Sequence, residues 1–130
     1  MNDEKKPVAV VIGATSKWQS DGRNTHLAHG TDIDDSALPV GIRWGIGGAI
    51  AQKFAAEGFF VALTTRNTRN AMALEQTITD QGGECMISEL DLVSDHSISS
   101  AFETIRSKIG NPDVLIYNAG YLEGLSLIHI

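Results

Sequence analysis

The 130-residue chain has one cysteine, 6% aromatic residues and no long hydrophobic run near its start. The lone Cys85 cannot form a disulfide within the chain, which argues against a small disulfide-stapled fold. The first apolar run, Val8 to Ile12, is too short for a signal peptide or a membrane span. Basic residues are scarce as well: 10 against 16 acidic residues give a net charge of -6, so a nucleic-acid partner is not expected. These absences predict a cytoplasmic globular protein without a membrane or nucleic-acid partner.

Strand-like and helix-like segments alternate along the chain. Short apolar runs at 8–12, 59–65, 85–90 and 114–117 predict strands. Between them, 47–57, 70–81 and 95–109 show helical spacing and end at glycines. This order predicts an α/β fold, a Rossmann-like doubly wound parallel sheet. With about four strands and three helices the sheet is incomplete, and its fourth strand is expected to form an apolar edge.

The first predicted helix carries its apolar residues on one side. Ala49, Ile50 and Phe54 share this side, which we expect to be buried against the sheet. Glycines precede the helix where a phosphate-binding turn would lie. Gly13, Gly45 and Gly47 can supply the sharp bend and the close backbone approach that such a turn needs, although residues 17–44 divide them. Their spacing alone is equally compatible with ordinary turn and cap glycines.

Three motifs, each after a predicted strand, resemble the short-chain dehydrogenase/reductase family. GATS (13–16) followed by GIGGAIA (45–51) is similar to the TGxxxGIG turn of that family, split by an insertion and with Ile12 in place of the usual Thr. Asp91-Leu92 matches after the third strand. NAG (118–120) matches the NNAG motif after the fourth, with Tyr117 replacing its first Asn. The enoyl-acyl-carrier-protein reductase branch, whose glycine turn is also spread out, is the alternative subgroup.

The resemblance implies a dinucleotide site at the carboxyl ends of the strands. The matching glycines would line the pyrophosphate, and Asp91 would accept a hydrogen bond from the adenine amino group. Asn118 and its two successors would shape the floor near the riboses. An Asx turn at Asp91 and a strand-closing turn at Asn118 are the structural alternatives. The full set expected to bind the cofactor is Gly13, Thr15, Ser16, Gly45, Ile46, Gly47, Thr65, Arg66, Asp91, Leu92, Asn118, Ala119 and Gly120.

The end of the second strand bears on the choice of cofactor. An NAD site places Asp or Glu about 20 residues after the glycine turn, whereas Arg accommodates the 2′-phosphate of NADP. Thr65 and Arg66 stand at this place, and Arg69 supplies a further cation. Arg66 could pair with the phosphate and stack on the adenine, while Thr65 donates its hydroxyl. We expect NADP(H) rather than NAD(H); a solvated loop arginine is the alternative.

Residues 17–44 form an insertion in the glycine turn. Its histidines and carboxylates match no metal-binding spacing, so a polar surface loop is expected rather than a metal site. Because lengthening a loop adds little closure entropy, the turn can survive the insertion. We expect the insertion to fold over the cofactor as a lid, with Lys17, Trp18 or Arg43 touching it. The polar residues in question are His26, His29, Asp32, Asp34 and Asp35.

No catalytic residue can be named. In the family, hydride passes between a nicotinamide and a carbonyl or alcohol carbon, helped by a Ser and the Tyr and Lys of Y-x-x-x-K. Neither Tyr117 nor Tyr121 begins such a motif. The resemblance therefore implies the cofactor-binding part of an NADP(H)-dependent oxidoreductase, inactive alone. Its parent would act on a small-molecule substrate and form a homo-oligomer.

The last residues, 125–130 (LSLIHI), depart from the polar loop expected after the NAG motif. We interpret them as a non-native tail, and residues 1–124 as the N-terminal portion of a nucleotide-binding domain. Two other interpretations stay open. The chain could belong to a non-catalytic dinucleotide sensor or interaction protein, or it could be a non-functional gene fragment.

Overall fold

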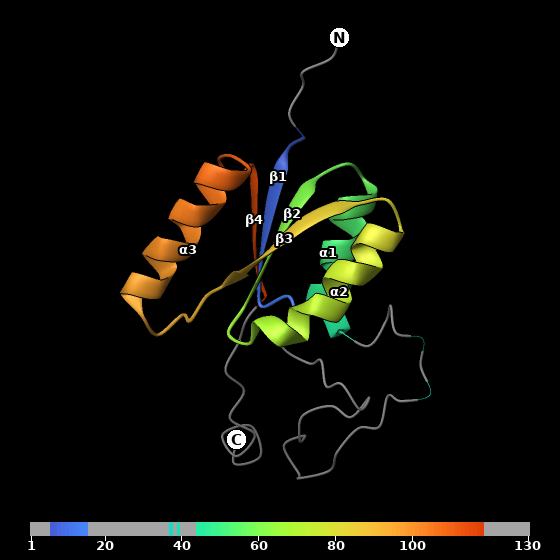
Figure 1. Cartoon of the computed structure of the whole chain (residues 1–130), viewed down its shortest axis with the longest axis horizontal. Helices are drawn as coiled ribbons and strands as arrows, with labels where there is room; N and C mark the ends of the chain where they lie inside the picture. Colours follow the sequence, from blue (N-terminus) through green and yellow to red (C-terminus); the bar gives the residue numbers. More distant parts are fainter. Residues whose placement is uncertain (1–5, 16–36, 38, 40–43, 119–130) are drawn as a thin grey trace, which may run out of the picture.

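The computed structural model describes residues 6–15, 37, 39 and 44–118. In these residues strands and helices alternate as β1 (Val8–Ile12), α1 (Gly45–Ala56), β2 (Phe60–Thr65), α2 (Thr68–Asp80), β3 (Glu84–Glu89), α3 (Asp95–Lys108) and β4 (Val114–Tyr117). The strands form one parallel sheet in the order β3-β2-β1-β4 (Figure 1). The expected Rossmann-like α/β fold is confirmed.

The strand order reverses beside β1. The chain moves outward from β1 through β2 to β3, and β4 then lies on the other side of β1. In the register, Ala9 of β1 pairs with Val61 of β2 and with Val114 of β4. In open parallel sheets, ligands bind outside the carboxyl ends of the strands at such a reversal. This topology directs attention to the ends of β1 and β4.

Helices cover both faces of the sheet, which explains why β1 is a continuous apolar run. Figure 1 shows α1 and α2 on one side and α3 on the other. Val11 belongs to the hydrophobic cluster that includes residues of α1 and α2, whereas Val10 and Ile12 belong to the cluster that includes residues of α3. All five residues of β1 are buried, as expected of a strand covered on both faces.

The buried side of α1 differs from the expected one. Ala49 is exposed, and Ile50 and Phe54 are only partly buried. The buried positions are instead the small residues Gly47, Gly48, Ala51 and Ala55. Ile50 and Phe54 still pack against the core cluster, so the prediction fails at Ala49 and in not naming the fully buried positions. Close packing against the sheet selects small side chains at those positions because they leave room for the backbone. The small-residue side brings the start of α1 close to the turn after β1.

Trp44, directly before α1, belongs to the hydrophobic core and is 1% exposed. Its side chain packs so closely on Gly48 that a Cβ on Gly48 would collide with the Trp44 Cβ. From the sequence, Trp44 is expected to be the last residue of the insertion. In the structure this residue packs as part of the domain.

The caps of α2 and α3 come from polar side chains. The Ser94 hydroxyl accepts from the Ser97 N–H at 3.1 Å, so the expected cap of α3 is confirmed. At α2, the Asn67 side chain accepts from the Arg69 N–H at 3.0 Å, and the helix begins at Thr68, two residues earlier than expected. None of the helices in the described residues is long and apolar enough to cross a membrane.

In the described part of the chain, β4 is an edge strand with exposed apolar side chains. Leu115 and Tyr117 are 55% and 67% exposed. They pair with Val10 and Ile12 of β1, which are buried beneath α3. On this face the cover therefore ends before it reaches β4. A sheet edge with exposed apolar groups favours pairing with another chain.

We expect the 130-residue chain to self-associate through β4. The double substitution Leu115→Lys and Tyr117→Lys should raise the monomer fraction, because charge on an edge strand opposes strand pairing. Sedimentation velocity would measure this fraction. Val93→Lys is the control, since Val93 is 91% exposed but lies outside the strands. A monomeric parent chain, or an equal effect of the control, would contradict the role of β4.

Candidate functional site

The turn after β1 is tied to the end of β2. The backbone N–H groups of Gly13 and Ala14 both donate to the carbonyl of Thr64, at 3.2 and 3.1 Å. The Thr64 hydroxyl donates in turn to the Val11 carbonyl at 2.9 Å. Gly13 has φ 85°, a left-handed conformation that favours glycine. The carboxyl end of β1 is therefore held in a defined turn.

Gly47 of α1 lies directly against this turn. A Cβ at Gly47 would collide with the Gly13 carbonyl oxygen and lie 2.8 Å from Asn118 Nδ2. Asn118 Nδ2 donates to the same carbonyl at 3.3 Å, and the Asn118 backbone N–H donates to the Ile12 carbonyl at 2.8 Å. Three residues far apart in the sequence thus meet at the reversal of the strand order. We call Gly13, Gly47 and Asn118 the glycine junction.

The start of α1 lies at the glycine junction and differs from the other two helix starts. Trp44, its N-cap residue, makes no side-chain cap hydrogen bond, whereas Asn67 and Ser94 cap the other two helices. The first turn of α1, like that of α2, contains no acidic residue. Gly45 opens the helix with φ 74°. The first N–H groups of an α-helix have no intrahelical acceptor, and the helix dipole adds positive potential there. This end of α1 can bind an anion such as a phosphate.

Two arginines follow the end of β2. Arg66 and Arg69 are exposed, and neither forms an ion pair with another described residue. β2 ends in Thr65 without a carboxylate; the acidic residue in register with it, Glu89, ends the neighbouring strand β3. The guanidinium groups are available to an anionic ligand.

Asp91, directly beyond β3, stabilises its own turn. Its Oδ1 accepts from the Val93 N–H at 3.1 Å, which is the Asx turn weighed as an alternative. Its backbone N–H donates to the Ser97 hydroxyl at 2.8 Å. The Asx turn uses one carboxylate oxygen, so it does not exclude a ligand at the other. Leu92 packs partly buried against the cluster beneath α3.

The structure brings part of the expected cofactor-binding set together at the carboxyl ends of the strands. Gly13, Gly47 and Asn118 are in contact, and Thr15 is hydrogen-bonded to Thr65 at 3.0 Å. Binding of a cofactor by these residues stays a prediction. Ser16, Ala119 and Gly120 lie outside the described residues, as do the inserted histidines and aspartates, the expected lid residues Lys17, Trp18 and Arg43, and the tail 125–130. Within the described ranges, no group of three or more His, Cys, Asp or Glu residues could hold a metal.

Sequence reasoning missed two contributors, Trp44 and Asn67. A tryptophan directly before a glycine-rich helix start was a signal for the first. An asparagine three residues before the expected helical stretch was a signal for the second, since Asn is a preferred N-cap.

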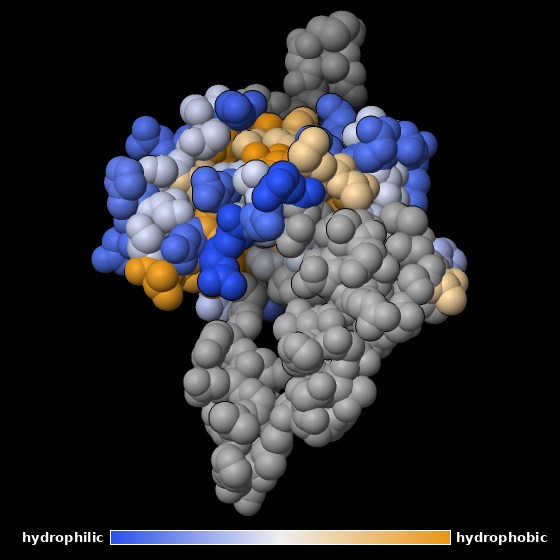
Figure 2. Space-filling view, turned by 60° about the horizontal axis from the view of Figure 1, so that its bottom comes forward, coloured by the Kyte–Doolittle hydropathy of each residue, from blue (hydrophilic) through white to orange (hydrophobic). Residues whose placement is uncertain are grey.

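Figure 2 shows the molecule turned so that the bottom of Figure 1 comes forward. On this side, hydrophobic residues are exposed in places between hydrophilic ones.

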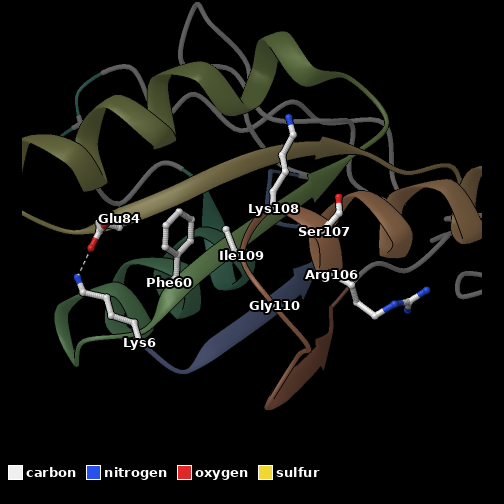
Figure 3. Close-up of a pocket in the computed structure, with 8 residues that line it drawn as sticks. All are labelled: Lys6, Phe60, Glu84, Arg106, Ser107, Lys108, Ile109 and Gly110. Atoms are coloured by element: carbon white, nitrogen blue, oxygen red, sulfur yellow. Dashed lines mark ion pairs between the residues drawn. The ribbon is translucent and has the colours of Figure 1, made fainter. Parts of the chain in front are cut away.

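A hollow of about 470 Å³ lies at the opposite ends of the strands (Figure 3). Phe60 and Glu84, the first residues of β2 and β3, line it together with the end of α3. Lys6 and Glu84 pair across it at 2.7 Å, and Arg106 extends away from this pair. Since ligands of parallel sheets bind at the carboxyl ends, this hollow is not the candidate site.

Comparison with protein families identifies the group to which the chain belongs. A family model described as short chain dehydrogenase matches residues 35–129. The chain belongs to the short-chain dehydrogenase family. The match begins in the inserted segment and includes α1 and all that follows in the described fold.

Relatives of this chain include proteins named as reductases. The chain is 36% identical over 85 residues to the 3-oxoacyl-[acyl-carrier-protein] reductase FabG of Aquifex aeolicus, which covers 65% of this chain and 34% of that protein. It is 28% identical over 101 residues to the (-)-isopiperitenone reductase of Mentha piperita, covering 75% of this chain and 32% of that one. The chain thus spans about a third of the length of these relatives.

Solved short-chain dehydrogenase structures share the fold. A metagenomic short-chain oxidoreductase in complex with NADP is 29% identical, with a TM-score of 0.66 over 90% of this chain and 40% of that chain. A Serratia marcescens short-chain dehydrogenase/reductase variant is 25% identical, with a TM-score of 0.65 over 91% and 37% of the two chains. The sheet and helices of the described residues therefore share the fold of the matching part of these solved structures.

Gly47→Ala should disrupt the glycine junction. Because the added Cβ would meet a backbone carbonyl, which cannot rotate away, overpacking should lower the free energy of unfolding by about 1–3 kcal/mol. Denaturant unfolding would measure it. Gly82→Ala is the control for backbone strain: Gly82 has φ 86° and open space around its Cβ position, so we expect a loss of about 1 kcal/mol there, without an effect on the junction. Wild-type stability of Gly47→Ala would contradict the close approach.

Cys85 of β3 behaves as a structural thiol. Burial, and secondarily the charge of Glu75, raises its pKa from 9.0 to about 11. The folded chain therefore holds the proton to higher pH than the unfolded chain does, and the thiol is mostly protonated at neutral pH. Ultraviolet absorbance of the thiolate should titrate near pH 11 in the folded chain and near pH 9.0 in denaturant. A folded-state midpoint at or below 9.0 would contradict the burial.

Proposed function

We propose that this chain is the cofactor-binding part of an NADP(H)-dependent oxidoreductase of the short-chain dehydrogenase family. The observation that carries the proposal is the glycine junction. Gly47 lies against the Gly13 carbonyl because Gly47 has no side chain, and Asn118 bonds to the same carbonyl. A dinucleotide needs its pyrophosphate to approach backbone as closely as such a junction permits.

The start of α1 would hold the pyrophosphate. Its first-turn N–H groups would donate to the phosphate oxygens, and no acidic residue in that turn opposes the charge. Ile46, which is 70% exposed in the same turn, would contact the cofactor beside it. Asn118 would act mainly by keeping the Gly13 turn in place, since its amide is already bonded there.

Arg66 would select NADP(H). Its exposed guanidinium can form a bidentate pair with the 2′-phosphate, and β2 offers no terminal carboxylate for the 2′-hydroxyl of NAD. Asp91 would bind the adenine amino group through the oxygen outside its Asx turn. The solved relative with NADP bound is consistent with this choice.

When bound, the nicotinamide would supply hydride chemistry between cofactor and a carbonyl or alcohol carbon. The residues of this chain would orient the cofactor, and we assign none of them to proton transfer. We infer that the parent protein takes a small-molecule substrate, assembles as a homo-oligomer and contributes its Ser and Y-x-x-x-K from further along its chain. The chain alone should bind the cofactor without turnover.

The test is fluorescence titration of the purified chain with NADPH and with NADH. Energy transfer from tryptophan to the reduced nicotinamide should appear with NADPH at lower concentration than with NADH. Saturable binding of neither dinucleotide would overturn the proposed function. Binding to the wild type but not to Gly47→Ala would place the site at the glycine junction.

Arg66→Ser should weaken NADPH binding by about tenfold to a hundredfold, because a hydrogen bond to a charged group contributes about 1.5–3 kcal/mol. NADH affinity should stay within about twofold, since NADH lacks the 2′-phosphate. Arg69→Ser is the matched control, because Arg69 is also an exposed arginine but belongs to α2. We expect a smaller effect there. Equal losses for both dinucleotides would contradict a phosphate contact at Arg66.

A further inference from the structure

A chain of side-chain hydrogen bonds connects the turn after β1 with the loop after β2. Thr15 Oγ1 donates to Thr65 Oγ1 at 3.0 Å. Thr65 Oγ1 also accepts from the Asn67 N–H at 3.2 Å and donates to the Asn67 carbonyl at 3.3 Å. Asn67 in turn caps α2 through the Arg69 N–H. We call Thr15, Thr65 and Asn67 the hydroxyl relay.

The Thr65 hydroxyl has no hydrogen-bonding capacity left for a ligand. A hydroxyl offers one donor and two acceptor sites, and the three bonds to Thr15 and Asn67 use all of them. Direct donation to a 2′-phosphate, as expected from the sequence, would require breaking the bond to the Asn67 carbonyl. Thr15 is 2% exposed, so its own hydroxyl is directed into the fold.

The relay spans the residue that would select the cofactor. Arg66 lies between Thr65 and Asn67, and both backbone bonds from the Thr65 hydroxyl reach across it. These bonds restrain the backbone on either side of Arg66, from which the exposed arginine side chain extends. A loop whose backbone is already restrained loses less conformational entropy when its arginine binds a phosphate.

We propose that Thr65 is a positioning residue for cofactor selection: it links the turn of the glycine junction to the Arg66 loop and acts through Arg66 rather than by touching the ligand. This inference rests on the proposed function. The sequence predicts that Thr65 contacts the cofactor directly, whereas in this proposal Thr65 acts through Arg66. A double-mutant cycle separates the two roles.

The experiment measures NADPH and NADH dissociation constants for Thr65→Val, Arg66→Ser and the double variant. Thr65→Val should weaken NADPH binding about fivefold, as one lost hydrogen bond predicts, with NADH changed less than about twofold. In the Arg66→Ser background, Thr65→Val should have no further effect on NADPH. Additive losses would overturn the proposal in favour of direct contact.

Two further variants separate positioning from general structural damage. Thr65→Ser keeps the hydroxyl and should restore the wild-type preference for NADPH. Thr77→Val removes a comparable hydroxyl, which donates to the Ala73 carbonyl at 2.9 Å within α2, and should leave the preference unchanged. Loss of preference in Thr65→Ser, or an equal loss in Thr77→Val, would overturn the proposal.

A measurement without cofactor keeps the inference testable if no dinucleotide binds. Thr65→Val should increase hydrogen exchange at the Asn67 amide severalfold, because its acceptor is the Thr65 hydroxyl. Thr65→Ser should not. An unchanged exchange rate in Thr65→Val would overturn the relay itself. Increased exchange without dinucleotide binding would leave the relay in place but refute the proposed function, and with it the role of Thr65 in cofactor selection.

Discussion

The contact of Gly47 with the carbonyl of Gly13 is the constraint on which the rest of the site depends. It brings the start of α1 to the end of β1, and the Asn118 amide bonds to the same carbonyl. Any side chain at Gly47 would separate the two elements. The small side chains on the buried side of α1 serve the same close approach, because larger ones would lift the helix away from the sheet.

The presence and order of the strands and helices were predictable from the sequence, because they depend on the local pattern of apolar residues and turn residues. Val8 to Ile12 and Val114 to Tyr117 have the same bounds in sequence and structure, since each is a short apolar run closed by a turn residue. The start of α2 was misplaced because it depends on one cap, Asn67. On α1 the hydrophobic pattern indicated Ile50 and Phe54, which pack against the core, but it missed the fully buried Ala51 and Ala55, because the sheet selects small side chains where the helix approaches it closely.

The candidate site was predictable as a set of strand-end residues, but its internal bonding was not. Position along the chain indicated that Thr15, Thr65 and Arg66 belong to neighbouring strand ends. It could not indicate that the Thr65 hydroxyl is saturated by Thr15 and Asn67, because that depends on the register of β1 and β2 and on a side-chain rotamer. The role of Thr65 therefore changes from a proposed ligand contact to a proposed support for Arg66.

The division of the glycine turn by residues 17–44 need not prevent such a site. The geometry requires three groups to meet: the Gly13 carbonyl, the backbone at Gly47 and the Asn118 amide. Each belongs to a different element, and packing of the small-residue side of α1 and pairing of β1 with β4 hold those elements together. A longer connection between Gly13 and Gly47 adds closure entropy that rises by only about 0.6 kcal/mol for each doubling of loop length. The junction is a property of the packed sheet and helix, so it tolerates a long connection where a contiguous motif would have a short one.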